Sequence, residues 1–329
     1  MKKILRRVLV AMLLGVAVYG GYMVWSGVGK MGQTLGAFAW WTFAAACALA
    51  FGNYVLRFLK WEFYLARLGI RGVPKADSFL TFLSGFVLTI TPGKVGEVFK
   101  SLVLKETYGV PIATTAPIVI AERVTDLIGI IVLIVAGSYG FRGGLLFAGI
   151  GAALVATLLV VIASRKLSLL LIGLTSRLPG RLGKVSPKLH ASYGSLATML
   201  RPSNLAIPTL LSIVAWALEC LSLWIILRGF GETTSVALSA FFYATSTLAG
   251  ALVAITPGGL GVTETALQGQ LMEIGHVAAS SSTAAMILTR FATLWFAVLV
   301  GFVALSLLKK RHPGLLADAP VVPAPVGGE

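Results

Sequence analysis

Charged residues are scarce in this chain: Asp, Glu, Lys and Arg make up 12% of its 329 residues, whereas 57% are apolar. A soluble domain carries roughly 25% charged residues. This chain therefore has too few charges to cover a water-facing surface, which excludes a soluble protein. Acidic residues are the scarcest, because 12 Asp and Glu stand against 27 Lys and Arg, for a net charge of +15. In so apolar a chain, the basic excess indicates membrane orientation and contact with anionic lipid, not nucleic-acid binding.

Cysteine is almost absent, since Cys47 and Cys220 are the two in the chain, both within apolar runs. Two cysteines without C-x-x-C spacing exclude a disulfide framework, and we interpret both as packing residues. His190, His276 and His312 stand away from Cys and carboxylates at ligand spacing, and the sequence has no Walker A or nucleophile-elbow motif. The sequence therefore predicts no metal, no cofactor and no enzymatic activity.

Long apolar runs dominate what is present. A membrane-spanning helix needs about 20 mostly apolar residues, and six runs meet this requirement. They are Val8–Trp25, Leu35–Leu56, Thr114–Gly137, Leu145–Ala163, Leu205–Leu227 and Ser281–Leu308. We therefore expect an all-α polytopic membrane protein with six spanning helices.

Two further apolar stretches are interrupted by Pro-Gly, a combination that breaks a helix. Ser78–Glu106 is broken at Pro92, and Val236–Ile274 is broken at Pro257. Each arm of the first stretch has about 13 residues, or about 20 Å, which is less than the roughly 30 Å hydrocarbon core. We predict two re-entrant helical hairpins. The first arm of the second stretch is long enough to span, so a crossing remains the alternative there.

The basic residues predict an orientation. With the N-terminus inside and both hairpins re-entrant, 19 of the 27 Lys and Arg fall in inside loops, whereas Lys30, Arg142 and Arg228 are the ones outside. This distribution obeys the positive-inside rule. We expect a multi-pass protein of the bacterial inner (plasma) membrane with both termini in the cytoplasm.

The two broken stretches resemble each other. Ile90–Gly96 aligns with Ile255–Gly261 at an offset of 165 residues, and Arg123 meets Arg290 two residues out of register. Each half is then a helix, a broken hairpin and a helix, and the halves have opposite orientations. Inverted repeats with broken helices are typical of alternating-access transporters.

This repeat divides the chain into five segments. They are an N-terminal membrane helix (1–34), a first half (35–163, hairpin 78–106), a basic cytoplasmic linker (164–203), a second half (204–310, hairpin 236–275) and a disordered cytoplasmic tail (311–329).

The hairpin tips carry the expected binding chemistry. The helix after each tip directs its positive N-terminal end at the tip, and Lys94 and Lys100 add charge at the first tip. This combination suits a phosphate or another anionic head group, and Glu97 could neutralise either lysine when the site is empty. The second tip has no lysine but has Glu264, so it could hold a cationic or hydroxyl-bearing portion, or a coupling proton. The alternative for both tips is a purely structural helix break.

Ionisable residues inside a membrane are costly, which makes them candidate functional residues. Arg123 and Asp126 share a helix face and are either clamped to the first tip or form an interfacial salt bridge. Arg290 is deep in the last helix, with Glu264 or Glu219 as its expected partner. The candidate substrate-binding residues are Thr91, Pro92, Gly93, Lys94, Gly96, Glu97, Lys100, Glu122, Arg123, Asp126, Glu219, Thr256, Pro257, Gly258, Gly259, Gly261, Glu264 and Arg290.

A further basic group follows the second run. Arg57, Lys60, Glu62 and Arg67 flank Trp61 and Tyr64. We interpret this group as an interfacial band of snorkelling side chains. The alternative is a site through which a head group gains access.

Three motifs together resemble the flippase-type membrane domain of the lysylphosphatidylglycerol synthase/flippase proteins. The motifs are T-P-G-K-x-G-E-x-x-K (Thr91 to Lys100), E-R-x-x-D-L (Glu122 to Leu127) and T-P-G-G-L-G-V-x-E (Thr256 to Glu264). The resemblance covers about residues 35–310. In two-domain members the synthase activity belongs to an additional soluble aminoacyl-transferase domain. The resemblance is to the membrane domain, so it does not imply synthase activity. It implies movement of a phospholipid, isoprenoid or glycolipid between leaflets.

We therefore expect a lipid translocase whose partners are the lipid substrate and the bilayer. The head group is expected between the two hairpin tips, and one half rocks against the other. The alternatives are an ion-coupled small-solute transporter, a membrane enzyme acting on lipid phosphates, or a non-transporting partner of an envelope enzyme. The lipid, the coupling ion and the oligomeric state are left open.

Overall fold

The computed structural model describes residues 17–24, 28–89, 98–139, 149–154, 198–253 and 257–315, with residues 15, 146, 156, 157 and 196. Within these residues every regular element is a helix and no strand occurs, in agreement with the expected all-α class. Two expected spans, Val8–Trp25 and Leu145–Ala163, lie largely outside the described residues. Most of the linker and the tail also lie outside them.

Four long helices correspond to the other four expected spans. Three of them are long and apolar enough to cross a membrane: Trp40–Arg67, Ser203–Gly229 and Ala279–Arg311. The fourth, α6, is continuous, but charged residues near its middle interrupt its apolar sequence. The helices are α3 (Trp40–Arg67), α6 (Ile112–Ser138), α10 (Pro202–Gly229) and the continuous rod of α13 (Ala279–Arg290), the π-helical turn η5 (Phe291–Trp295) and α14 (Phe296–Arg311).

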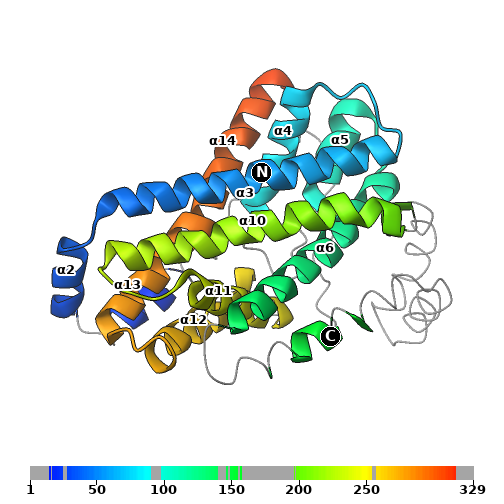
Figure 1. The fold of residues 1–329 in the computed structure, drawn as a ribbon. Helices are drawn as coiled ribbons and strands as arrows, with labels where there is room; N and C mark the ends of the chain where they lie inside the picture. The colour runs from blue at the N-terminus through cyan, green and yellow to red at the C-terminus, as the bar shows by residue number, and fades with distance from the viewer. Residues whose placement is uncertain are drawn as a thin grey trace, which may run out of the picture.

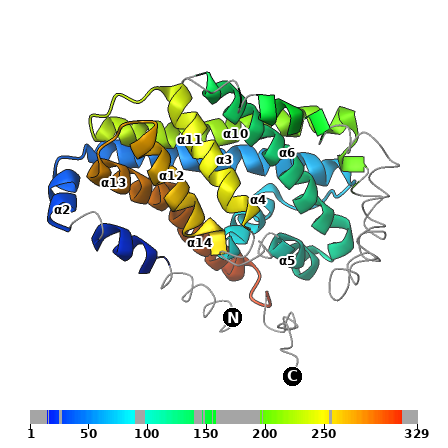
Figure 2. The same ribbon diagram turned by 90° about the horizontal axis from the view of Figure 1, so that it is seen from below.

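Helices α3 and α10 pack along each other in opposite directions (Figures 1 and 2). The Asn53 amide donates a hydrogen bond to the Ala215 carbonyl at 2.8 Å, and the Ser222 hydroxyl donates to the Ala46 carbonyl at 3.2 Å. Residue numbers therefore rise along α3 as they fall along α10. This antiparallel arrangement is the one that an inverted repeat requires of the first helix in each half.

Both broken stretches form pairs of short helices. The first consists of α4 (Lys75–Ser84), the 3-10 turn η1 (Gly85–Leu88) and α5 (Phe99–Tyr108). The second consists of α11 (Val236–Leu252), the 3-10 turn η4 (Pro257–Gly259) and α12 (Val262–Glu273). In each stretch the two arms pack against each other.

The arms are short for membrane spans. Helix α11 has 17 residues, or about 25 Å, and the other arms are shorter, so none reaches the roughly 30 Å hydrocarbon core. This length favours re-entry over crossing for the second hairpin. The re-entry of both hairpins, and with it the total of six spans, stays a prediction.

The two halves exchange contacts reciprocally. Helix α6 packs against α11, whereas α14 packs against α4 and η1. The first arm of each hairpin thus lies on a helix that follows the hairpin of the other half.

Glycines allow both close approaches. A Cβ atom on Gly137 of α6 would lie 2.6 Å from the Ala237 carbonyl oxygen of α11. A Cβ atom on Gly301 of α14 would lie 2.6 Å from the Val87 amide nitrogen of η1. These two glycines are 164 residues apart, close to the offset between the broken stretches.

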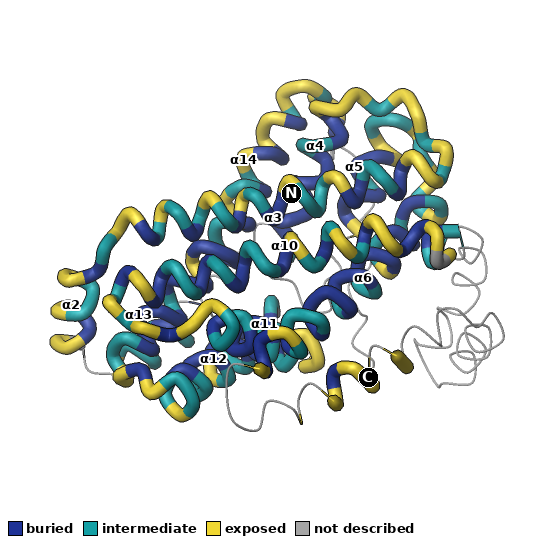
Figure 3. The backbone as a smooth tube through the Cα atoms, in the orientation of Figure 1, coloured by how far each residue is buried: buried dark blue, intermediate teal, exposed yellow. Residues whose placement is uncertain are grey.

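Large apolar side chains cover much of the outer surface. Trp41, Leu210 and Leu299 are 68%, 62% and 60% exposed on α3, α10 and α14. Figure 3 shows buried positions alternating with exposed ones along α3 and α10. Exposed apolar surface on this scale suits contact with lipid. The short helix α2 (Val28–Gly36) precedes α3 and packs against α13.

Candidate functional site

Lys60 is fully buried, which corrects the interpretation of the basic group on α3. Its ammonium donates hydrogen bonds to the Asp126 carboxylate at 2.5 Å and to the Ser212 hydroxyl at 2.7 Å. Trp61 and Tyr64 are also fully buried. The interpretation of these residues as a snorkelling interfacial band is therefore wrong. Helix α3 continues inside the protein to Arg67, and a buried carboxylate on α6 compensates the charge of Lys60.

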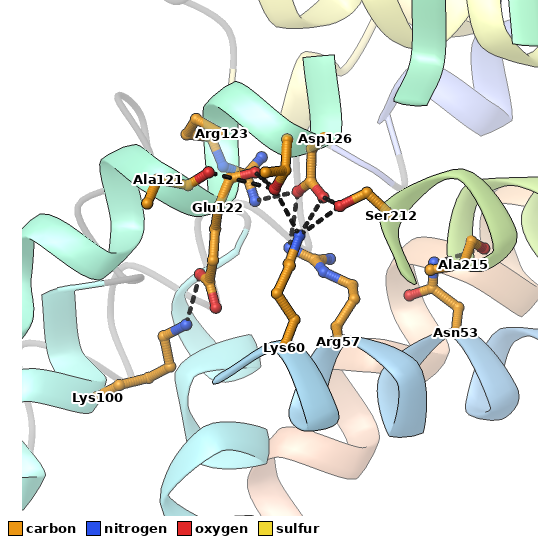
Figure 4. Close-up of polar contacts among 11 residues, drawn as sticks. Asn53, Arg57, Lys60, Lys100, Ala121, Glu122, Arg123, Asp126, Ser212 and Ala215 are labelled. Carbon is orange, nitrogen blue, oxygen red and sulfur yellow. Dashed lines mark hydrogen bonds and ion pairs between the residues drawn. The ribbon is translucent and has the colours of Figure 1, made fainter. Parts of the chain in front are cut away.

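Asp126 is the centre of an ion network that joins α3, α6 and α10 (Figure 4). Besides Lys60, it contacts Arg57 at 3.5 Å and Arg123 at 3.1 Å, and it accepts a hydrogen bond from Ser212 at 2.9 Å. The Arg123–Asp126 pair on one helix face is the one that the sequence indicated. The network fixes the positions of two arginines whose side chains border a cavity, described below.

Lys100 of α5 pairs with Glu122 of α6 at 2.8 Å, and both side chains are buried. The ammonium also lies 4.7 Å from the centre of the Trp61 ring, a cation–π contact. Glu97, which the sequence analysis offered as the neutralising partner of Lys100, lies outside the described residues.

Arg290 ties the second break to the last helix. Its Nε donates to Glu264 at 2.6 Å, and its Nη2 donates to the Gly258 carbonyl at 2.9 Å. The other oxygen of Glu264 accepts a hydrogen bond from the Gly261 amide at 2.7 Å, at the start of α12. Of the two partners expected for Arg290, the structure therefore gives Glu264. This carboxylate is fully buried and holds the break in place.

A π-helical turn follows Arg290 directly. Such turns are frequent at functional sites, because they leave carbonyl groups without their usual helical partners. Here the Tyr54 hydroxyl of α3 donates to the Thr293 carbonyl at 3.0 Å. The turn also places Thr293 on the wall of the cavity.

These elements enclose a cavity of about 130 Å³ between the halves. Thr89, the last described residue before the first break, lines it, and so does Gly258 within the second break. The described residue just before the first break and a residue within the second break therefore border the same space. Among the described residues, the charged side chains on its wall are Arg57, Lys100, Arg123, Glu219 and Arg290.

The carboxylates stand behind the cations. Glu122, Asp126 and Glu264 each hold a cation of the wall but do not line the cavity themselves. The charge presented to the cavity is therefore mainly positive. Such a wall favours an anionic group, and the preformed ion pairs hold it in that geometry.

Glu219 is the one carboxylate on the described part of the wall. It is 7% exposed and accepts a hydrogen bond from the Tyr243 hydroxyl of α11 at 2.5 Å. The sequence placed Glu219 in mid-membrane, and the structure places it facing the cations.

The structure thus brings part of the predicted set together. Lys100, Arg123, Glu219, Gly258 and Arg290 line the cavity, while the others that are described support the wall or the second break. The remaining predicted residues, or their side chains, lie outside the described part: Thr91, Pro92, Gly93, Lys94, Gly96, Glu97, Thr256 and Pro257.

Sequence reasoning missed Tyr54 and Tyr243, and it kept Arg57 and Lys60 out of the candidate site, with a head-group entry site as the alternative. The usable signal was that Arg57 and Lys60 are three residues apart and share a helix face. Tyr54 lies one turn before Arg57 on the same face.

Comparisons with known proteins identify the family of this chain. Residues 12–301 match the family described as the lysylphosphatidylglycerol synthase TM region. The chain belongs to this family. A UPF0104 membrane protein from Methanothermobacter thermautotrophicus is 22% identical over 307 residues, which cover 88% of this chain and 90% of that protein. The matched family region contains every described residue of the cavity wall, so the candidate site belongs to the membrane domain itself.

Proposed function

We propose that the protein is a lipid translocase that moves a lipid with an anionic or polar head group between leaflets. The observation that carries this proposal is the cavity between the halves, whose described wall has four cations and one carboxylate. A cavity needs a volume of roughly 10–15 Å³ to hold one water molecule. The 130 Å³ cavity therefore accommodates a small head group, while the acyl chains stay in the surrounding lipid.

An inverted repeat supports transport by alternating access. The antiparallel α3 and α10, and the reciprocal contacts of Gly137 and Gly301, are arrangements that such a repeat would produce. Rocking of one half against the other would expose the cavity to each leaflet in turn.

Orientation follows from the basic end of the molecule. The Asp77–Arg311 ion pair joins the start of α4 to the end of α14. Arg67, Lys75 and Arg201 belong to the same end, because α3 and α10 are antiparallel. By the positive-inside rule this end is cytoplasmic, which suits a protein of the bacterial inner membrane with both termini inside.

Leaflet movement of a labelled lipid tests the proposal. Purified protein is reconstituted in phosphatidylcholine vesicles with a trace of fluorescent phosphatidylglycerol, and dithionite quenching reports the outer-leaflet fraction. We expect wild type to move the lipid, and Arg57→Gln to move it at least tenfold more slowly. Arg57 is chosen because Asp126 keeps its closer partner Lys60 in this variant.

Arg67→Gln is the matched control, because Arg67 is exposed at the end of the same helix. Its rate should equal that of wild type. Equal rates for Arg57→Gln and Arg67→Gln, with both proteins folded, would contradict the assignment of the cavity as the head-group site.

A further inference from the structure

Glu219 differs from the other buried carboxylates of the site. Among the described residues it has no ion-pair partner, and its described hydrogen-bond donor is the neutral Tyr243 hydroxyl. The other three carboxylates are each paired with a cation: Glu122 with Lys100 at 2.8 Å, Asp126 with Lys60 at 2.5 Å and Glu264 with Arg290 at 2.6 Å.

The surroundings of Glu219 come from five helices. Ionisable groups face it from α3, α6, α11 and α13 as well as from its own helix α10, and cations and anions are both among them. They are Tyr54 and Arg57 of α3, Asp126 of α6, Tyr243 of α11, Arg290 of α13 and Cys220 of α10. The proton affinity of Glu219 therefore depends on the charge inside the cavity.

Glu219 also occupies a particular place in the repeat. Helices α3 and α10 have 28 residues each, and Arg57 and Glu219 are both the eighteenth residue of their helix. Both line the cavity. The first helix of each half therefore contributes one charged side chain to the wall, and the two charges are opposite in sign. The charge of Glu219 can be neutralised by a proton.

The charge balance of the site indicates what it can carry. The described wall and its supporting ion pairs contain five cations, Lys60 included, and four carboxylates. Within this described set, the net charge is one positive charge when Glu219 is ionised. A singly charged head group balances it. A doubly charged head group leaves one negative charge in a site of low dielectric, unless Glu219 takes up a proton.

We propose that Glu219 is a proton-binding site and that the cavity loads a phosphate-monoester head group together with one proton on this carboxylate. This inference rests on the proposed function. The proton comes from water on the loading side and leaves on the other side with the head group. No bond of the lipid is formed or broken, and each cycle carries one net negative charge instead of two.

Linkage makes the coupling reciprocal. A second negative charge on the head group strengthens proton binding at Glu219, and the bound proton strengthens head-group binding by the same factor. A phosphodiester head group carries a single charge, so its binding does not require Glu219 to take up a proton. The site therefore treats the two lipid classes differently under a pH gradient.

The test compares two labelled probes in phosphatidylcholine vesicles: phosphatidic acid, a phosphate monoester, and phosphatidylglycerol, a phosphodiester. A gradient of one pH unit is imposed, and an enclosed pH dye reports proton movement. With one proton per lipid, we expect the gradient to change the steady-state leaflet ratio of phosphatidic acid about tenfold. The ratio of phosphatidylglycerol should not change.

Variants isolate the carboxylate. Glu219→Gln should abolish the response to the gradient and the movement of protons, at whatever rate it moves phosphatidic acid, whereas Glu219→Asp should keep both. Tyr243→Phe removes the hydrogen bond to the ionised form, so the pH midpoint of the response should rise. Glu62→Gln, on the same helix as Arg57 and outside the cavity, is the matched control and should behave as wild type.

The outcomes separate this inference from the function on which it rests. If wild type moves phosphatidic acid and the gradient has no effect, the proton site is overturned and the translocase stands. If wild type moves neither probe, both fall. Infrared difference spectra give a readout apart from transport: adding phosphatidic acid should produce a protonated-carboxyl band in wild type that Glu219→Gln lacks, and identical spectra would overturn the proposal.

Discussion

Buried charges at single positions organise this molecule. Lys60 is fully buried, and its ammonium is held by Asp126 and Ser212 from two other helices. A buried pair of this kind adds little net stability, but loss of one partner leaves an uncompensated charge. The role of Lys60 is therefore to hold Asp126, and through it Arg57 and Arg123, at the wall of the cavity.

Replacing Lys60 tests this role. We expect Lys60→Met to lower the free energy of unfolding by about 3–5 kcal/mol, because Asp126 loses its closest cation in a buried site. Thermal unfolding in detergent measures the effect. Lys105→Met, at an exposed position of α5, is the control and should leave the transition unchanged. A transition for Lys60→Met that coincides with this control would argue against the network.

Asp77 predicts a pH dependence at the end of the molecule where α4 begins and α14 ends. Burial opposes its ionisation, but hydrogen bonds from Tyr108, His312 and Arg311 outweigh burial and lower the pKa of Asp77 to about 2. Since the unfolded value is about 3.9, ionised Asp77 stabilises the fold above about pH 4. This contribution is lost as the pH falls from about 4 to about 2.

We expect Asp77→Asn to be less stable than wild type by about 1–2 kcal/mol at pH 6, after allowance for the exposed Arg311 partner. The difference should shrink as the pH falls toward 2. Unfolding in detergent at pH 6, 4 and 3 gives this difference directly, because all other carboxylates are common to both proteins. A difference that stays constant over this range would refute the assigned ion pairs.

Residues of the site were predictable where charge alone identified them. Glu122, Arg123, Asp126, Glu219 and Arg290 are ionisable residues in apolar sequence, and the structure buries or partly buries all five. Lys60 and Arg57 were not identified, because their helix continues beyond the apolar run that predicted it. The sequence does not show that α6 places the Asp126 carboxylate opposite the part of α3 that follows Leu56.

At the scale of elements, helix breaks and close crossings decide the arrangement. The Pro-Gly signals correctly divided both stretches into short helices, and the apolar runs located α3, α6, α10 and the α13–α14 rod. The π-helical turn η5 was not predicted, since no local sequence rule specifies it. The reciprocal crossings could not be predicted either, because they depend on which helix faces each glycine.

The two crossing glycines give a paired prediction. Gly137→Ala and Gly301→Ala should each lower the free energy of unfolding by about 1–3 kcal/mol, since the new methyl group meets backbone atoms that cannot move away cheaply. Gly269→Ala in α12 is the control, because nothing lies within 4 Å of its Cβ position, and it should be neutral or slightly stabilising. Thermal unfolding of the three variants side by side provides the comparison. Loss of stability in one crossing variant alone would mean that the crossings are not equivalent.

At the scale of the whole molecule, two halves enclose one charged cavity. Composition predicted a membrane protein and the motifs predicted its family, and the family match over residues 12–301 confirms this. The inverted repeat and the movement between leaflets are proposals that the antiparallel α3 and α10 support. The wall of the cavity draws on both halves, so no single segment of sequence specifies it.

Two-sided access to the cavity tests the central claim most directly. Thr247 lines the cavity, and we suggest Thr247→Cys in a background with Cys47→Ala and Cys220→Ala. A membrane-impermeant maleimide is then added to right-side-out and to inside-out vesicles. Gln33→Cys, exposed on α2, serves as a position that one side alone should label.

Alternating access predicts that the cysteine at position 247 is labelled from both sides and that phosphatidic acid slows the labelling on each. The cysteine at position 33 should be labelled from one side. Labelling of position 247 from the same single side as position 33, whatever lipid is present, would contradict the account.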